Sequence, residues 1–288
     1  MIVSAPAKIN LTLRIIGKRP DGYHELESVM QMLSLADSLV IGDADTLRFT
    51  CSDPALDGED NLVLKAARLL LTRCPEGRGA RIHLEKKIPS QAGLGGGSSD
   101  AAAALSALNE FWDIRLPADE LFPLAAQLGS DVPFFMNGPS AVVRGRGEEV
   151  TPVINKTPCH IVVAKPTAGL STPRVYADLH APVIPHGAEQ PHRLPETRAM
   201  IRALETGNIE SVARAVSNAL EGPALQLLPE LYPLRERMLE QGCLSVLLCG
   251  SGSALFGICA DAETARRAAL ELTNDFPWTW SGPWLLFR

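Results

Sequence analysis

A glycine-rich segment at residues 89–105, PSQAGLGGGSSDAAAAL, restricts the possible folds of this chain more than any other part of the sequence. Its glycines, Gly93, Gly95, Gly96 and Gly97, follow a strand-like run and lead directly into an alanine-rich helix. Glycine tolerates positive φ and lets the backbone come close to a ligand. The first turn of the helix then presents free N–H groups and a partial positive charge, which favour a phosphate chain. The segment therefore predicts a nucleotide site.

The spacing differs from two common phosphate-binding motifs. A Walker loop carries Lys and Ser/Thr after its last glycine, whereas Ser98, Ser99 and Asp100 follow Gly97. A dinucleotide fingerprint needs a third glycine inside a βαβ unit, whereas Ser98 stands at that position and no clear strand follows the helix. The alternative is a flexible turn without a ligand. Asp100 is interpreted as structural, because the helix dipole favours a carboxylate in the first turn.

Composition excludes several classes of protein. The net charge of −6 disfavours a domain that coats nucleic acid, which is expected to be basic. The 6 cysteines show no C-x-x-C pair and no histidine at metal-ligand spacing, which indicates reduced, mostly buried thiols. The first residues lack the pattern of a signal peptide, and no apolar run is long enough for a membrane span. We therefore expect a cytoplasmic protein with neither nucleic acid nor a membrane as partner.

Hydrophobic periodicity predicts an α+β protein. Strands are expected at 2–16, 30–41, 47–51, 80–88, 160–164, 244–248, 254–259 and 284–287, and a strand pair at 141–153. Helices are expected at 61–70, 98–111, 117–128, 195–206, 209–220, 229–241 and 262–274. Prolines and irregularly spaced histidines at 180–195 indicate an exposed loop and not a metal site. The predicted domains are 1–153, with the nucleotide loop, and 154–288, with a small antiparallel sheet covered by helices on one face.

Three blocks of sequence stand together with the glycine loop: PAKINL at 6–11, GSDVPFF at 129–135 and GSGS at 250–253. In this order they resemble the superfamily of galactokinase, homoserine kinase, mevalonate kinase and phosphomevalonate kinase. The segment DGYHEL at 21–26 is similar to the members that act in the non-mevalonate isoprenoid route. The resemblance covers nearly the whole chain.

The resemblance implies a two-domain GHMP kinase fold, with an N-terminal domain like ribosomal protein S5 domain 2 and a C-terminal ferredoxin-like domain. It also implies ATP-dependent phosphorylation of the 2-hydroxyl on the methylerythritol part of a cytidine diphosphate conjugate, with Mg²⁺ accompanying ATP. The substrate would lie in the cleft between the domains. No carboxylate pair stands out as a protein ligand for Mg²⁺, and the oligomeric state stays open.

The same resemblance assigns roles to individual residues. Asp131 would accept the hydroxyl proton, and Lys8 beside it would orient the hydroxyl and offset developing charge. The ATP phosphates would bind at Gly93, Leu94, Gly95, Gly96, Gly97, Ser98 and Ser99, and the adenine near Asn61, Leu62 and Lys86. Tyr23 and Tyr176 would stack on the two faces of cytosine, with His24 at its edge. The remaining substrate contacts would be Asn10, Thr172, Pro173, Gly250 and Ser251.

Each of these residues also has an ordinary structural interpretation. A lysine that alternates with apolar residues, as Lys8 does, usually lies on a solvated strand face. Asp131 has the position of a helix cap, and Tyr176 that of a half-buried helical tyrosine. Two other functions also remain as alternatives: another small-molecule kinase of the superfamily, or a non-catalytic nucleotide- or RNA-binding protein on the same fold.

Overall fold

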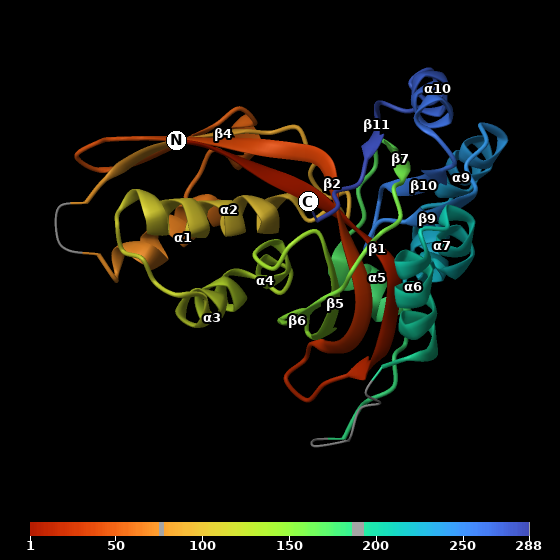
Figure 1. The fold of residues 1–288 in the computed structure, drawn as a ribbon, viewed down its shortest axis with the longest axis horizontal. Coiled ribbons are helices and arrows are strands. Elements are labelled where there is room, and N and C mark those ends of the chain that lie inside the picture. Colours follow the sequence, from red (N-terminus) through yellow and green to blue (C-terminus); the bar gives the residue numbers. More distant parts are fainter. Residues whose placement is uncertain (75–77, 186–192, 288) are drawn as a thin grey trace. The chain divides into compact units, whose positions relative to one another are not determined.

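The computed structural model describes residues 1–74, 78–185 and 193–287 (Figure 1). The chain divides into two compact units. Unit 1 comprises residues 1–7, 35–88 and 95–137, and unit 2 comprises residues 8–34, 89–94 and 138–288. This division differs from the predicted consecutive domains, because residues 8–34 group with the second half of the chain. The predicted boundary at residue 153 stays a prediction.

Two long strands open the chain and continue from one unit into the other: β1 (Ile2–Lys18) and β2 (His24–Gly42). A turn at 20–22 connects them, and Gly22 has a φ of 88°. The expected alternation in β1 does not produce one solvent-exposed and one buried face, because residues 7–13 are all buried. The polar side chains Lys8, Asn10 and Thr12 therefore need partners inside the protein.

Unit 1 packs helices against a small sheet. Its elements are β3 (Leu47–Cys51), a 3₁₀ turn (Pro54–Leu56), α1 (Leu62–Leu71), β4 (Ala80–Glu85), α2 (Gly96–Phe111), α3 (Ala118–Leu128) and α4 (Val132–Phe135). β4 pairs in parallel with β3 and antiparallel with Ser38–Gly42 of β2. Helices α1 and α2 lie side by side (Figure 1). Ala101, Ala104 and Leu105 of α2 are completely buried in the core of this unit.

Unit 2 contains more of the chain. Its strands are β5 (Ser140–Gly145), β6 (Glu149–Pro152), β7 (His160–Lys165), β8 (Ser217–Asn218), β9 (Ser245–Leu248), β10 (Leu255–Cys259) and β11 (Trp278–Pro283). Its helices are α5 (Thr172–Asp178), α6 (Pro195–Thr206), α7 (Ile209–Ala215), α8 (Glu221–Leu227), α9 (Leu231–Glu240) and α10 (Ala262–Leu272). The antiparallel sheet β11-β7-β10-β9 confirms the sheet expected in the second half of the chain.

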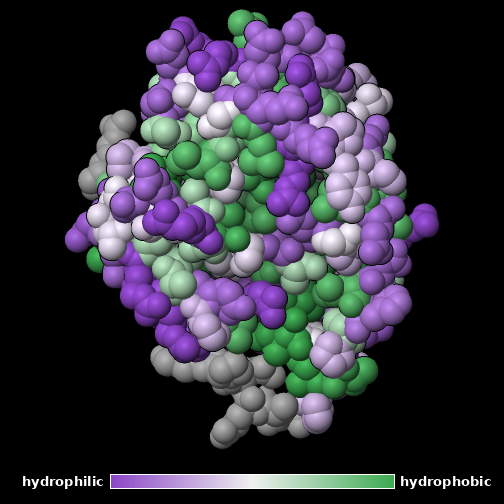
Figure 2. Space-filling view, turned by 90° about the vertical axis from the view of Figure 1, so that its right-hand side faces the viewer, coloured by the Kyte–Doolittle hydropathy of each residue, from purple (hydrophilic) through white to green (hydrophobic). Residues whose placement is uncertain are grey.

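Helix α10 illustrates why the elements near the end of the chain were predictable. Ala265, Ala268 and Leu272 are buried at helical spacing, and α10 packs on β7, β10 and β11. Asp261 caps the helix by accepting a hydrogen bond from Thr264 N at 2.7 Å. Hydrophilic side chains cover its outer surface, at the top of the face in Figure 2.

Two predicted elements are wrong. The last strand is Trp278–Pro283 and not 284–287, because residues 278–283 pair with β7, while Trp284 donates its indole N–H to Thr157 O at 2.7 Å. The helix predicted at 209–220 ends at Ala215, because Ser217 and Asn218 pair in parallel with β1. Tertiary pairing overrides local periodicity at both places. The prediction of an exposed loop at 180–195 falls partly outside the described residues.

Asn218 ties β8 to the turn at Gly250. Its amide donates to Leu248 O at 3.0 Å and Gly250 O at 2.7 Å, and its carbonyl accepts from Leu220 N at 2.9 Å. The side chain is 9% exposed, so its removal leaves buried backbone groups without partners.

We expect Asn218→Ala to lower the free energy of unfolding by about 1–3 kcal/mol, because buried carbonyls lose their donor. Urea titration followed by tryptophan fluorescence measures this loss. The control is Asn274→Ala, since Asn274 is exposed and bonds only to Glu271 O within its own helix end. Equal unfolding midpoints for the two variants would contradict the role assigned to Asn218.

Candidate functional site

The glycine loop has the strand-to-helix geometry that the sequence predicts. Gly93 and Gly95 have φ values of 75° and 72°, and α2 begins at Gly96, two residues earlier than expected. A Cβ at Gly93 would lie 1.8 Å from Cys249 O, so no other residue fits there. At the other end, Ser99 N donates to Gly95 O at 2.9 Å and starts the helical ladder. The first N–H groups of α2 therefore have no intrahelical acceptor.

The predicted adenine residues lie around this helix start, within unit 1. A Cβ at Gly97 would lie 3.7 Å from Leu62 Cδ1, and one at Gly96 would lie 3.3 Å from Lys86 Nζ. Asn61 precedes Leu62 and caps α1 by accepting a hydrogen bond from Val63 N at 2.9 Å. The structure thus brings the three side chains to one place, and their contact with adenine stays a prediction.

Lys86 is not a freely available cation. Its Nζ donates to Asp37 Oδ2 at 2.5 Å and to Asp100 Oδ2 at 2.7 Å, and its side chain is only 9% exposed. Burial lowers the pKa of Lys86, but the opposing effect of Asp100 and Asp37 together is larger. The net pKa is raised, so the ammonium stays charged. Burial raises the pKa of Asp100 to about 7, Lys86 opposes this shift and Asp37 adds to it.

Asp131 lies next to the glycine loop within unit 1. A Cβ at Gly129 would lie 3.8 Å from Ser98 Oγ, so residues 129–131 adjoin the start of α2. Asp131 occupies the N-cap position of α4, but its side chain makes no capping hydrogen bond with the residues of that helix, all of which are described. The interpretation of Asp131 as a simple helix cap therefore loses support.

Lys8 is buried in unit 2, at 4% exposure, so the alternative of a solvated lysine is wrong. Its Nζ donates to Asn10 Oδ1 at 2.8 Å, and Asn10 Nδ2 donates to Ser28 Oγ at 2.8 Å. Ser28 Oγ donates in turn to Thr12 O at 2.6 Å. This hydrogen-bonded chain fixes the position of the ammonium group. A Cβ at Gly250 would lie 3.1 Å from Lys8 Nζ, so the turn at Gly250 passes directly beside it.

The predicted substrate residues continue from this turn. Ser251 Oγ and Thr172 Oγ1 are 2.7 Å apart, and Pro173 follows in the first turn of α5. Tyr176 lies one helical turn further on and contacts His24, with ring centroids 4.8 Å apart. Burial lowers the pKa of His24, and Lys18 lowers it further, so the imidazole is neutral at pH 7. Unit 2 thus gathers these substrate residues together with Lys8.

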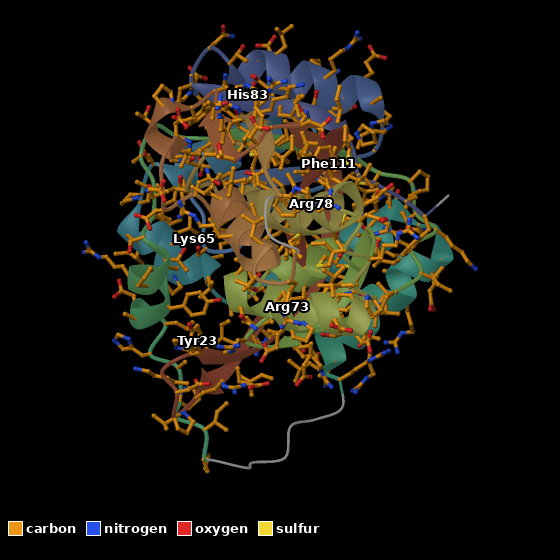
Figure 3. The ribbon with its side chains drawn as sticks, turned by 90° about the vertical axis from the view of Figure 1, so that its left-hand side faces the viewer. Tyr23, Lys65, Arg73, Arg78, His83 and Phe111 are labelled. Carbon is orange, nitrogen blue, oxygen red and sulfur yellow. The ribbon has the colours of Figure 1, made fainter. Side chains whose placement is uncertain are left out.

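Tyr23 lies at the surface, in the connection between β1 and β2 (Figure 3). Its ring is 52% exposed, and the Arg146 guanidinium lies 4.8 Å from the ring centroid, a cation–π contact. Tyr23 therefore contacts Arg146 and Tyr176 contacts His24. The predicted sandwich of a base between the two tyrosines stays a prediction.

Sequence reasoning missed three residues of these sites: Asp37, Arg146 and Asn218. An aspartate inside the apolar run 30–41 is an unusual choice for a strand, and that signal could have marked Asp37 as a buried partner. A strand pair was predicted at 141–153, but the contact of Arg146 with Tyr23 depends on strand register. No local signal marks Asn218.

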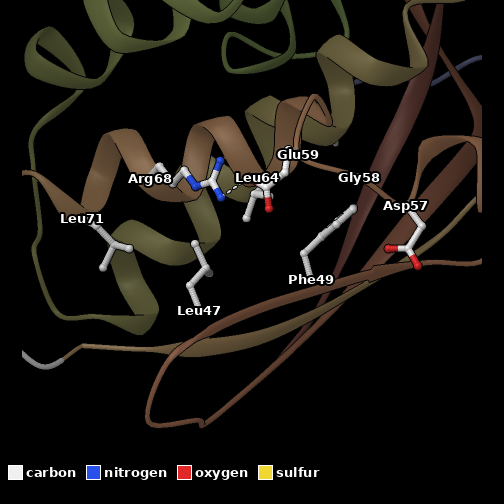
Figure 4. A pocket seen from close by; sticks show the side chains of 8 residues that line it. All are labelled: Leu47, Phe49, Asp57, Gly58, Glu59, Leu64, Arg68 and Leu71. Atoms are coloured by element: carbon white, nitrogen blue, oxygen red, sulfur yellow. Dashed lines mark hydrogen bonds and ion pairs between the residues drawn. The ribbon is translucent and has the colours of Figure 1, made fainter.

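A separate pocket of about 410 Å³ lies between β3 and α1 (Figure 4). Its lining residues are Leu47, Phe49, Asp57, Gly58, Glu59, Leu64, Arg68 and Leu71. Arg68 pairs with Glu59 there. None of these residues belongs to the predicted ATP contacts, so the pocket does not mark the nucleotide site. Elsewhere in the described chain, no group of three or more His, Cys, Asp or Glu side chains is arranged to hold a metal ion.

All 6 cysteines are free thiols, and five of them are buried, as predicted. None of the described helices combines the length and apolar character needed to span a bilayer.

Comparison with known proteins agrees with this arrangement. The models of the GHMP kinases N terminal domain and the GHMP kinases C terminal domain match residues 61–139 and 200–277. The 4-diphosphocytidyl-2-C-methyl-D-erythritol kinase of Pelotomaculum thermopropionicum is 42% identical over 268 residues, 92% of this chain and 91% of that protein.

Solved structures extend the comparison to the fold. A crystal structure of 4-(cytidine 5'-diphospho)-2C-methyl-D-erythritol kinase matches with a TM-score of 0.83 at 40% identity, over 99% of both chains. Homoserine kinase from Cytophaga hutchinsonii matches with a TM-score of 0.70 at 19% identity, over 99% of this chain and 94% of that one. At this identity the match shows the shared fold alone. Since identity near 40% extends over nine-tenths of the sequence, the chain belongs to the 4-diphosphocytidyl-2-C-methyl-D-erythritol kinase family of the GHMP kinases.

Proposed function

We propose that this protein transfers the γ-phosphoryl group of ATP to the 2-hydroxyl of 4-diphosphocytidyl-2-C-methyl-D-erythritol, in the non-mevalonate isoprenoid route. The bond between the γ-phosphorus and the β-γ bridging oxygen breaks, and a bond from that phosphorus to the 2-oxygen forms. The products are the 2-phosphate and ADP. The observation that carries the proposal is identity near 40%, over nine-tenths of the chain, to kinases named for this substrate.

Unit 1 supplies the nucleotide end of the reaction in this proposal. The first N–H groups of α2, at Gly96, Gly97 and Ser98, bind the phosphates with the positive end of the helix dipole. Asn61, Leu62 and Lys86 border the adenine. Asp131, beside Ser98, accepts the proton that leaves the hydroxyl as the new bond forms. Phosphoryl transfer needs alignment and charge stabilisation more than covalent help, and a fixed backbone supplies both.

Unit 2 supplies the acceptor end. The chain of hydrogen bonds from Thr12 to Lys8 holds the ammonium in a water-poor environment, where it stabilises developing negative charge strongly. Asn10, Gly250, Ser251, Thr172 and Pro173 line the phosphate and sugar part of the substrate. A neutral His24 can both donate and accept at the edge of cytosine, which distinguishes cytosine from uracil.

Mg²⁺ is part of the proposal as a companion of ATP. This ion binds mainly through nucleotide phosphates and water, with one or two carboxylates at most. The first N–H groups of α2 would hold the phosphates to which the ion binds, and the ion would supply positive charge that neutralises those phosphates. The cytoplasmic location and the lack of nucleic-acid or membrane partners stay predictions.

A different acceptor is the main competing function. Homoserine and mevalonate kinases share the fold at 15–19% identity only, and they give no support for their substrates here. ATP consumption measured with the cytidine diphosphate conjugate, homoserine and mevalonate in parallel tests the proposal. Turnover with homoserine or mevalonate, and none with the conjugate, would overturn it.

We expect Asp131→Asn and Lys8→Ala each to lower kcat by at least about 100-fold while ATP still binds, because both groups act mainly in the transition state. Single-turnover rates and ATP affinity measure the two effects separately. Asp119→Asn and Lys65→Ala are the controls, since both residues are exposed on helices of unit 1. Rates within tenfold of wild type for either site variant would exclude its assigned role.

We expect Tyr176→Ala to weaken binding of the cytidine substrate about 5- to 150-fold, since stacking on a base contributes about 1–3 kcal/mol. Tyr176→Phe keeps the ring and should bind nearly normally. His24→Ala should instead reduce the preference for cytidine over its uridine analogue. Calorimetry with both ligands and with ATP measures these effects.

The control is Tyr232→Ala, because Tyr232 is half exposed on α9. Weaker ATP binding with unchanged cytidine binding would place Tyr176 and His24 in the wrong site. Equal losses for both ligands, with a lower melting temperature, would favour a purely structural tyrosine.

A further inference from the structure

Three charged side chains lie buried under the first turn of α2: Asp37 from β2, Lys86 after β4, and Asp100 in α2 itself. Asp37 is completely buried and Asp100 is 2% exposed. With every group ionised the cluster carries one excess negative charge. An excess charge in a dry environment is costly unless hydrogen bonds compensate it or a proton neutralises it.

The two carboxylates are not equivalent. Asp37 Oδ1 accepts hydrogen bonds from the backbone N–H groups of Lys87 and Ile88, at 2.5 and 2.8 Å, in addition to the Lys86 bond on Oδ2. Asp100 accepts no backbone hydrogen bond among those found in the described residues: its Oδ2 accepts from Lys86, its other side-chain interaction is with the Asp37 carboxyl, which raises its pKa, and its Oδ1 has no hydrogen-bond partner there. The excess charge is therefore least stabilised on Asp100, and Asp100 is the group that binds a proton. Its pKa of about 7 agrees with this assignment.

Within the described parts of the chain, no ion pair other than that with Lys86 is found for Asp100. From β3, Cys51 faces the cluster, but burial raises its pKa, so the thiol is neutral. On α1, Lys65 and Arg68 pair at the surface with Asp60 and Glu59. The acidic residues of α3, Asp119 and Glu120, are exposed, and α4 contains only apolar residues after its cap, Asp131.

The cluster touches the backbone that would bind phosphate. A Cβ at Gly96, the first residue of α2, would lie 3.3 Å from Lys86 Nζ and 3.0 Å from Ile88 Cγ2. Asp100 stands four residues further along the helix, one turn in. A phosphate at the start of α2 would therefore bring new negative charge close to a carboxylate that is already poorly stabilised.

We propose that Asp37, Lys86 and Asp100 are positioning residues of the glycine loop, and that ATP binds with uptake of a proton at Asp100. This inference rests on the proposed function, because it takes ATP to be the ligand of the loop. Protonation leaves the cluster neutral and removes repulsion toward the phosphates. Lys86, held by Asp37, keeps the backbone at Gly96 in place.

The sign of the pH dependence follows from linkage. Bound ATP raises the pKa of Asp100 above its value of about 7 in the free protein. Between the two values the complex holds more protons than the free protein, so affinity falls as pH rises through that interval. The limit for one proton is about tenfold per pH unit. Below pH 7, Asp100 contributes little to the pH dependence of ATP affinity.

Calorimetry of ATP with Mg²⁺ at pH 6, 7, 8 and 9, in two buffers of different ionisation enthalpy, measures affinity and proton uptake together. The γ-phosphate titrates near neutral pH on its own, so the readout is the difference between wild type and Asp100→Asn. We expect wild type to lose about 3- to 10-fold more affinity than Asp100→Asn between pH 7 and 8, and to take up an additional fraction of a proton. The control Asp119→Asn should behave as wild type.

A stability measurement supports the same assignment without ATP. A raised pKa makes the contribution of Asp100 to folding stability greatest below its unfolded value and lost as pH rises toward 7. The melting temperature of Asp100→Asn relative to wild type should therefore rise between pH 5 and 8. If Asp100→Asn does not fold, Asp100→Ser is the second uncharged variant.

Equal pH dependence and equal proton uptake in wild type and the uncharged variants, with ATP bound in each, would overturn the inference and leave the proposed function intact. A lack of ATP binding by wild type at every pH would overturn the proposed function, and the inference with it.

Discussion

The contact between Gly93 and the Cys249 carbonyl is the constraint on which much of unit 2 depends. It allows no side chain at Gly93, and it places the glycine loop against the turn at Gly250. Lys8 N donates to Leu94 O at 2.9 Å, so β1 is bound to the same loop. One close backbone approach thus joins three segments that lie far apart in the sequence. The buried polar chain from Lys8 to Thr12 is possible because these segments exclude water together.

The two units each contain a buried lysine, and the hydrogen-bond partners of these lysines differ. In unit 2, Lys8 Nζ donates to the neutral side chain of Asn10, which in turn bonds to Ser28. In unit 1, Lys86 is matched by two carboxylates, so its charge is used within the protein. The two lysines are similar in burial but differ in what surrounds them. Local sequence does not separate these two situations, because the partners of each lysine are set by the folded structure.

Much of the fold was predictable, since periodicity and capping act locally. The alternation in β1, the apolar face of α1 and the cap Asn61 all specify their elements within a few residues. The function and the glycine loop followed from motifs, whereas β8, β11 and the partners of Lys86 did not. Each of these depends on residues outside the local segment: Asn218 pairs with Leu13, and Lys86 bonds to Asp37, 49 positions away, and to Asp100, 14 positions away. Local pattern carries no information on such pairing.

The interleaving of the two units has a consequence for synthesis on the ribosome. Every residue of unit 1 precedes residue 138, so this unit can fold while the rest of the chain is still being made. Residues 8–34 are made early, yet the part of β1 in unit 2 has no β8 to pair with until residues 217–218 are made, and β7 has no β11 until residues 278–283 are made. Helix α2 can therefore form early, whereas the turn at Gly250 beside Lys8 is made much later. Until residues 217–250 have emerged, the polar side chains of β1 in a nascent chain lack part of the surroundings that bury them.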